Sequence, residues 1–137
     1  MPREINPWAM YPRKTSTSPL PDALKMEVTS KANELIETVL KPRYIQPPPE
    51  NPQFNYIVDI YGKWYHKAFY FCAKYCVPGP NAIVPDFEAK FARMQYAGTQ
   101  RFHLSYMRYT EQWVQLYTDL TVDECIEAIR DEPYFSI

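Results

Sequence analysis

The sequence is poor in glycine, histidine and cysteine. Its 137 residues include 3 glycines, 2 histidines and 3 cysteines. With so few glycines, we do not expect a phosphate-binding loop built from backbone N–H groups. The histidines and cysteines are few, and no Cys-x-x-Cys pair occurs among them, so a structural zinc site is not expected either. The sequence therefore predicts neither a metal ion nor a cofactor.

Long apolar runs are also missing. No window approaches 18 apolar residues without a charge, and the sequence therefore predicts no membrane span. The first residues lack the apolar core of a secretory signal. Cys72, Cys76 and Cys125 form an odd, scattered set, unlike the disulfide framework of a small secreted domain. We expect reduced cysteines in a soluble, cytoplasmic protein.

The remaining composition is typical of one folded domain. Hydrophobic residues make up 46% of the chain and charged residues 23%, with a net charge of -1, which fits a single core at this length. Proline and tyrosine are unevenly distributed: ten of the 14 prolines precede Gln53, and every tyrosine except Tyr11 follows Arg43. The chain thus has an N-terminal part interrupted by prolines and a C-terminal part rich in aromatic residues.

Residues 1–21 are predicted to form an extended arm. They carry five prolines, each of which fixes its own φ and biases the preceding residue toward extended conformations. The arm also carries Trp8, Met10 and Tyr11, whose apolar side chains need a surface to cover them. We expect the arm to dock either on its own domain or on a protein partner.

Residues 22–137 are predicted to form a single domain that begins with an amphipathic helix over residues 22–41. Pro21 and Asp22 suit a helix start, and Pro42 is expected to end the helix. Apolar residues recur at helical spacing along one face, at Leu24, Val28, Ala32, Leu35 and Val39. This pattern predicts a helix that packs one face against the rest of the domain.

A proline-rich connector follows the helix over residues 42–53. Three consecutive prolines within it favour a local polyproline II conformation. Because the connector lies between two structured segments, we interpret it as a stiff strap. The alternative is a ligand for an aromatic groove of the SH3 or WW type.

Residues 54–118 are rich in aromatic and β-branched residues and predict about five antiparallel strands. The first two strands are expected to meet at Gly62-Lys63, because a Gly-X pair suits a two-residue hairpin loop. This register places Asp59 opposite His66, and it predicts an outward face that carries Tyr61, Trp64, His66 and Tyr70. Charged and aromatic residues also recur at helical spacing over residues 63–76, so a helix there is the rival interpretation.

A second helix is predicted over residues 121–131. Thr121 and Glu124 form the sequence signature of a capping box, and Pro133 follows the end of the apolar pattern. Together these elements predict an α+β fold. Its curved antiparallel sheet has about five strands, and the long N-terminal helix and the short C-terminal helix pack on one face.

Asp59 and His66 are the strongest candidates for catalysis. A carboxylate beside an imidazole orients the ring and raises its pKa, as a general base requires. The same two residues also make an ordinary cross-strand polar pair. Cys72 lies on the same predicted face but roughly 20 Å from His66 along the strand, too far for a Cys–His nucleophilic pair. The sequence contains no serine-nucleophile motif and favours a non-enzymatic role.

Nucleic-acid binding is a second candidate function. Basic residues alternate with aromatic residues on the later strands, as in sheets that stack bases; they are Lys90, Arg93, Arg101 and Arg108. Residues 1–110 carry 14 basic and 9 acidic groups, whereas residues 111–137 carry 1 basic and 7 acidic groups. The acidic end of the chain and the sequence pI of about 6.1 disfavour nucleic acid as the partner.

Protein binding has the most sequence features in its favour. Tryptophan, tyrosine, methionine and arginine are enriched in interface cores, and the uneven charge suits oriented docking. The predicted contact residues are Trp8, Met10, Tyr11, Tyr61, Trp64 and Tyr70. We therefore predict a non-enzymatic accessory or structural subunit that binds a protein partner, or a second copy of itself, through the arm and the sheet face. The alternative is a cone-shaped α+β domain that binds a small ligand, or is catalytic, through Asp59 and His66.

The aromatic pattern of three stretches is similar to that of a known family. The stretches are FNYIVDIYGKWYHKAFYFCAKY, PGPNAIVPDFEAKFARMQY and RFHLSYMRYTEQW. Over roughly residues 40–135 the chain resembles a small uncharacterised bacterial family of unknown function. The resemblance implies no activity, cofactor or catalytic residue.

Overall fold

The computed structural model describes residues 18–48, 50, 53–79 and 85–137. Most of the predicted arm, with Trp8, Met10 and Tyr11, lies outside the described residues. Within the described ranges, no helix has the length and apolar character needed to span a bilayer.

The N-terminal helix is continuous but irregular. It consists of α1 (Asp22–Leu35), a π-helical segment η1 (Ile36–Leu40) and a last turn α2 (Lys41–Tyr44). Where η1 ends, the N–H of Lys41 donates to the carbonyl of Ile36, five residues back. This widened turn precedes Pro42, whose ring would crowd the preceding turn of a regular α-helix and which has no N–H to donate. The helix therefore continues to Tyr44, and the prediction that it ends at Pro42 is wrong.

The sheet confirms the predicted α+β class. Five antiparallel strands lie in chain order, namely β1 (Tyr56–Tyr65), β2 (Ala68–Cys76), β3 (Asp86–Gly98), β4 (Arg101–Met107) and β5 (Trp113–Leu120). The sheet is open, with β1 and β5 at its edges. Because residues 68–76 form a strand, the rival helix over this part of the chain is excluded.

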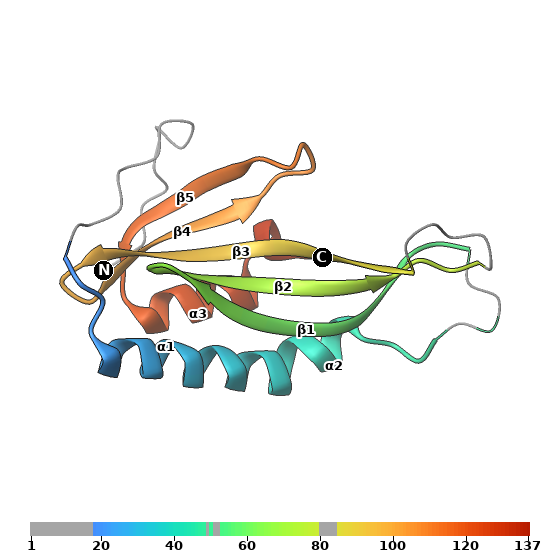
Figure 1. Ribbon diagram of the computed structural model, residues 1–137, viewed down its shortest axis with the longest axis horizontal. Helices are drawn as coiled ribbons and strands as arrows, with labels where there is room; N and C mark the ends of the chain where they lie inside the picture. Colours follow the sequence, from blue (N-terminus) through green and yellow to red (C-terminus); the bar gives the residue numbers. More distant parts are fainter. Residues whose placement is uncertain (1–17, 49, 51–52, 80–84) are drawn as a thin grey trace.

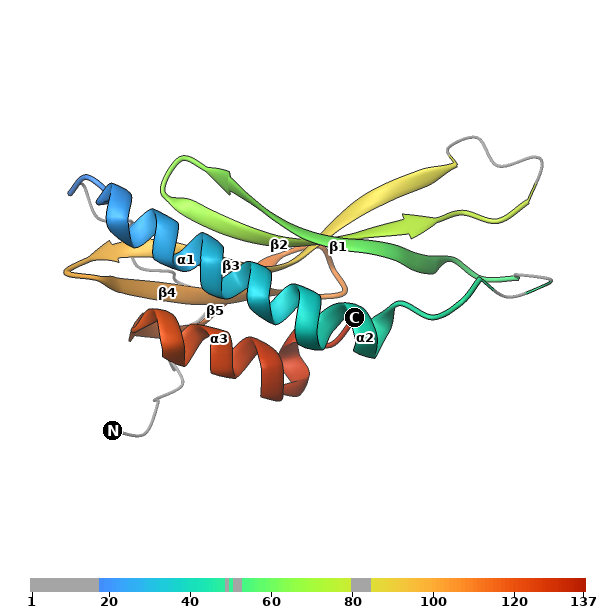
Figure 2. The ribbon, with the colours of Figure 1, turned by 90° about the horizontal axis from the view of Figure 1, so that it is seen from below.

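The helices lie on one face of the sheet. After β5, the chain forms α3 (Val122–Asp131) and a short 3₁₀ turn η2 (Pro133–Phe135). Figure 1 shows α1, α2 and α3 below the sheet, and Figure 2 shows α1 and α3 side by side across that face. We call the opposite side of the sheet the helix-free face.

The turn between β1 and β2 differs from the prediction. The chain turns at residues 66–67, where His66 has a φ of 54°, instead of at residues 62–63. Gly62 lies inside β1, and a Cβ atom built on it would lie 2.1 Å from the ring Cζ of Phe69. The glycine is therefore required by close packing against an aromatic ring. Glycine suits both a tight hairpin loop and a crowded position inside a strand, so the sequence pattern did not distinguish the two.

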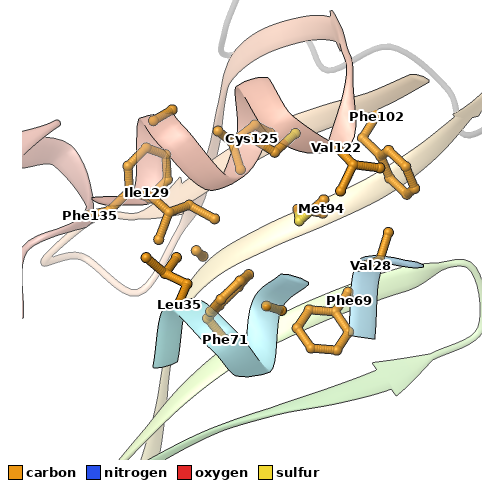
Figure 3. Packing of buried hydrophobic residues seen from close by; sticks show 14 of the residues in the cluster. Val28, Leu35, Phe69, Phe71, Met94, Phe102, Val122, Cys125, Ile129 and Phe135 are labelled. Atoms are coloured by element: carbon orange, nitrogen blue, oxygen red, sulfur yellow. The ribbon is translucent and has the colours of Figure 1, made fainter. Parts of the chain in front are cut away.

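The core fills the space between the helices and the sheet (Figure 3). It combines side chains from α1, from the inner face of the sheet and from α3, among them Val28, Leu35, Phe69, Phe71, Met94, Phe102, Val122, Cys125 and Ile129. Each large apolar side chain that is fully buried contributes about 1.5–3 kcal/mol. This shared core holds the five strands on the helices, and it lies on the side of the sheet opposite the helix-free face.

The predicted capping box of α3 is confirmed. The N–H of Glu124 donates to Thr121 Oγ1 at 3.2 Å, and Glu124 Oε1 accepts from the N–H of Thr121 at 3.0 Å. An ion pair of 2.6 Å between Lys31 and Asp123 connects α1 to the start of α3. Both contacts fix the first turn of α3 beside α1.

Candidate functional site

The structure does not form the predicted Asp59–His66 pair. Asp59 lies opposite Lys74, and its carboxylate lies 3.4 Å from Lys41 Nζ. His66 lies in the turn after β1, where its ring packs 4.2 Å from that of Tyr65. The shifted turn places His66 seven residues after Asp59, just beyond the end of β1 and about 20 Å away at the usual rise. A general base oriented by Asp59 is therefore ruled out by the register.

Metal and thiol chemistry find no support in the described part of the chain. There, no group of three or more His, Cys, Asp or Glu side chains could hold a metal ion. None of the three cysteines is in a disulfide; Cys72 and Cys125 are buried and Cys76 is half-buried. Burial, and secondarily the charge of Glu88, raises the pKa of the Cys72 thiol to about 11. The thiol is therefore protonated at neutral pH and is a poor nucleophile.

Trp64 lies on the other face from Tyr61. The two residues are three positions apart on one continuous strand, so their side chains point to opposite sides of the sheet. Trp64 Nε1 donates to Thr29 Oγ1 of α1 at 2.8 Å, and its ring packs edge-on against Phe69 at 5.2 Å. Trp64 therefore braces β1 against α1, and its predicted place beside Tyr61 and Tyr70 is wrong.

The four basic candidates for nucleic-acid binding do not gather in one patch. Arg101 lies at the start of β4, with its guanidinium 3.7 Å from Glu124. Arg108 lies in the turn after β4, where its N–H donates to the carbonyl of Gln112. Lys90 and Arg93 are on the helix-free face, where a register shift between β2 and β3 places residues three apart on the same side.

The helix-free face carries a cluster of aromatic and charged residues from β1, β2, β3 and β5. We call it the aromatic–basic cluster and define it as Tyr61, Lys63, Tyr70, Glu88, Lys90, Arg93 and Trp113. Tyr70 lies between Lys63 and Arg93 in the strand pairing. The cluster thus unites Tyr61 and Tyr70, predicted as partner contacts, with Lys90 and Arg93, predicted as nucleic-acid contacts.

The cluster exists because the sheet is strongly curved. Tyr70 is on β2 and Trp113 on β5, which would be about 14 Å apart in a flat sheet. Their ring centroids are nevertheless only 5.8 Å apart. All four strand pairs contain register shifts, and such irregularities bend and twist a sheet. Figure 1 shows β4 and β5 turning away from α1, which leaves the helix-free face concave.

The concave face holds a cavity of about 470 Å³ that is open to solvent. Four members of the aromatic–basic cluster line it together with two residues at the end of β1: Lys63, Tyr70, Lys90 and Trp113, with Trp64 and Tyr65. Lys90 Nζ also lies 6.0 Å from the ring centroid of Tyr70. The cavity therefore offers aromatic surface together with positive charge.

Glu88 is the acidic residue of the aromatic–basic cluster. Its carboxylate accepts from Lys63 Nζ at 2.7 and 2.9 Å and from the hydroxyl of Tyr61, and it lies 3.3 Å from Lys90 Nζ. These donors hold the pKa of Glu88 at about 2. Burial and the bond to Glu88 raise the pKa of Tyr61. At neutral pH the two lysines are thus paired with one ionised carboxylate.

Arg93 has a different environment. Its guanidinium lies 4.8 Å from the ring centroid of Trp113, and its Nη2 is 3.5 Å from Ser105 Oγ. Its Nε is buried and has no hydrogen-bond partner. Arg93 therefore owes its position mainly to stacking on Trp113.

The sequence interpretation missed Lys63, Glu88 and Trp113. Lys63 follows Tyr61 by two residues, so recognising β1 as continuous would have placed both on one face. Trp113 had no local signal, because its contact with Tyr70 depends on the curvature of the whole sheet.

Comparison with known proteins identifies the family. A model of a domain of unknown function, DUF3024, matches residues 20–136, which leaves most of the predicted arm outside the match. No curated protein and no solved structure matches the chain. The match agrees with the resemblance to an uncharacterised family of unknown function, whereas a bacterial origin stays a prediction. The chain therefore belongs to the DUF3024 domain family.

Proposed function

We propose that the chain is a non-enzymatic subunit that binds a protein partner through the aromatic–basic cluster. The observation that carries this proposal is the contact between Tyr70 and Trp113 across the concave helix-free face. Both side chains are half-buried and line the cavity. The few residues that dominate the binding energy of protein interfaces are enriched in tyrosine, tryptophan and arginine, and they lie in well-packed pockets.

The ionisable groups of the cluster support binding more than catalysis. Glu88 is kept ionised by Lys63, Tyr61 and Lys90, and the high pKa of Cys72 keeps its thiol protonated. A general acid or base works best with a pKa near the working pH. Neither Glu88 nor Cys72 meets this condition.

The arm remains part of the proposal. Lys67 Nζ, in the turn after β1, donates to the carbonyl of Ser18 at 2.6 Å. The cavity-lining residue Tyr65 adjoins the same turn. A partner seated in the cavity would therefore lie close to Ser18, the first described residue of the predicted arm.

Affinity capture tests the proposal. The tagged full chain is incubated with a lysate of its native source, and bound proteins are identified by mass spectrometry. We expect one partner at stoichiometric amount, lost in the Tyr70→Ala/Trp113→Ala variant and weakened in the Trp8→Ala/Tyr11→Ala variant. Tyr109→Ala is the matched control, because Tyr109 is 92% exposed and lies outside the cluster. Retention of the partner by the Tyr70→Ala/Trp113→Ala variant, with its circular dichroism unchanged, would contradict the proposal.

Binding of a small molecule is the second candidate, and the cavity volume favours it. About 470 Å³ lies within the range of 300–1,000 Å³ that is common for ligand sites. Recovery of the chain alone in the capture experiment would support this candidate over a protein partner. A compound that raises the melting temperature of the native chain, but not that of Trp113→Ala, would then establish it.

A further inference from the structure

We infer that Arg93 binds a carboxylate of the partner, so that the partner docks an acidic segment on the helix-free face. The inference rests on the proposed function and names the chemistry that this site recognises. It is argued from the hydrogen bonds of Arg93, from the distribution of charge around it and from the geometry of a guanidinium.

The domain itself does not satisfy the guanidinium of Arg93. The bond to Ser105 Oγ, at 3.5 Å, is at the long limit for a hydrogen bond. The Nε atom is buried without an acceptor. Such orphan donors are rare in folded proteins, since a buried donor without a partner costs about 1–3 kcal/mol. Arg93 therefore carries unused hydrogen-bonding capacity.

Arg93 also has no counterion among the residues that the structure describes. Across the described ranges, no carboxylate lies within 4.0 Å of its guanidinium, whereas Lys63 and Lys90 on the same face both contact Glu88. A half-buried charge is usually paired, because removing it from water is costly. The pairing of the lysines with Glu88 makes the unpaired state of Arg93 a local exception. An anion from outside the chain would supply the missing counterion of Arg93.

A carboxylate fits this site well. A guanidinium presents two parallel N–H groups that match the two oxygens of a carboxylate. Stacking on Trp113, at 4.8 Å, restricts the plane in which these groups can point. The adjoining cavity is lined by Tyr70 and Trp113 and would accept an apolar or aromatic side chain beside the acid.

A polypeptide fits better than a nucleic acid. Nucleic-acid binding needs several cations free to contact phosphates. Lys63 and Lys90 are already occupied by Glu88, which is ionised at neutral pH and would repel a phosphate backbone. One free guanidinium beside aromatic surface instead suits a short segment in which acidic and aromatic residues alternate.

Peptide titration of the ¹⁵N-labelled full chain tests the inference. The probes are an eight-residue peptide of alternating Glu and Tyr, its Gln and Tyr counterpart, and an eight-nucleotide oligothymidine. We expect the Glu peptide to shift the Arg93 Nε–H resonance and to bind at least about tenfold more tightly than the Gln peptide, as a charge-assisted hydrogen bond implies. Arg93→Met should abolish this preference. Arg93→Lys, which keeps the charge without the fork, should retain part of it.

Three results would overturn the inference: equal binding of the two peptides, no binding of either, or a preference for the oligonucleotide. Should Arg93→Met fail to fold, Arg93→Lys and the peptide pair still decide. Partner capture separates this inference from the proposed function. If the partner is lost in the Tyr70→Ala/Trp113→Ala variant but kept in the Arg93→Met variant, only the proposed role of Arg93 is contradicted. The absence of any partner would sink the proposed function instead.

Discussion

Gly62 shows how one missing side chain shapes the sheet. Its backbone lies against the ring of Phe69, which occupies the space that a side chain at residue 62 would need. We expect Gly62→Ala to lower the free energy of unfolding by about 1–3 kcal/mol, the usual effect of overpacking. Urea denaturation measures the change. In the Phe69→Leu background the same substitution should be less harmful, and an unchanged denaturation midpoint for Gly62→Ala would contradict this packing.

Glu88 is expected to make stability depend on pH in the acid range. Its pKa is about 2 in the folded chain and about 4.3 in an unfolded chain, so the unfolded state binds the proton first. The stabilisation is complete above the unfolded pKa and disappears as pH falls through the folded pKa. The difference in unfolding free energy between the native chain and Glu88→Gln should therefore shrink between pH 5 and pH 2. Denaturation at several pH values checks this, and a constant difference would argue against the ionised cluster.

The three cysteines are expected to differ in reactivity. Cys72 is buried, and its pKa is about 11, while Cys125 is fully buried in the core. Cys76 is half-buried near the end of β2. A thiol reagent such as Ellman's reagent at pH 8 should modify Cys76 first and the other two only on unfolding. Loss of the fast phase in Cys76→Ser would confirm the assignment, and its persistence would refute it.

Among the secondary-structure elements, α3 depends most visibly on its cap. Thr121 and Glu124 exchange two hydrogen bonds at its first turn. Thr121→Ala should lower the free energy of unfolding by about 1 kcal/mol. Thr118→Ala is a nearby comparison on β5, outside the cap. Thermal and urea denaturation of both variants would test this, and equal losses would indicate that the cap contributes nothing specific.

Strand β1 illustrates how one turn position affects many side chains. A turn at residues 62–63 would place Tyr61 and Trp64 together, whereas the continuous strand separates them onto opposite faces. Trp64 then reaches Thr29 of α1, while Tyr61 reaches Glu88 of β3. This parity alone places Trp64 against α1 and Tyr61 on the helix-free face.

For the molecule as a whole, the described residues already form an extensive core. Its buried residues run from Leu24 to Phe135, and the family match covers residues 20–136. We therefore expect residues 18–137 alone to melt cooperatively, with the circular dichroism spectrum of the full chain. The same truncation should lose the captured partner. Failure of the truncated chain to fold would instead make the arm part of the core and would remove its proposed role in binding.

The extent of prediction differed between features for physical reasons. The apolar face of the first helix and the cap of α3 depend on residues a few positions apart, and both were predicted. Pro42 was expected to end the helix, but a widened turn accommodates it. The hairpin turn was misplaced because glycine suits both a tight loop and a crowded strand. Because the turn lies elsewhere, Asp59 and His66 do not form the expected pair.

Local order along the chain thus establishes the α+β class, the helix near each end and the strand-rich middle, because periodicity and capping act within a few residues. The aromatic–basic cluster required more. Tyr70 meets Trp113 because the irregular strand pairs between β2 and β5 curve the sheet. Among the described residues, Arg93 has no carboxylate beside it, whereas Lys63 and Lys90 both contact Glu88. Such contacts depend on distances across strands, and these distances follow from register and curvature instead of from sequence spacing.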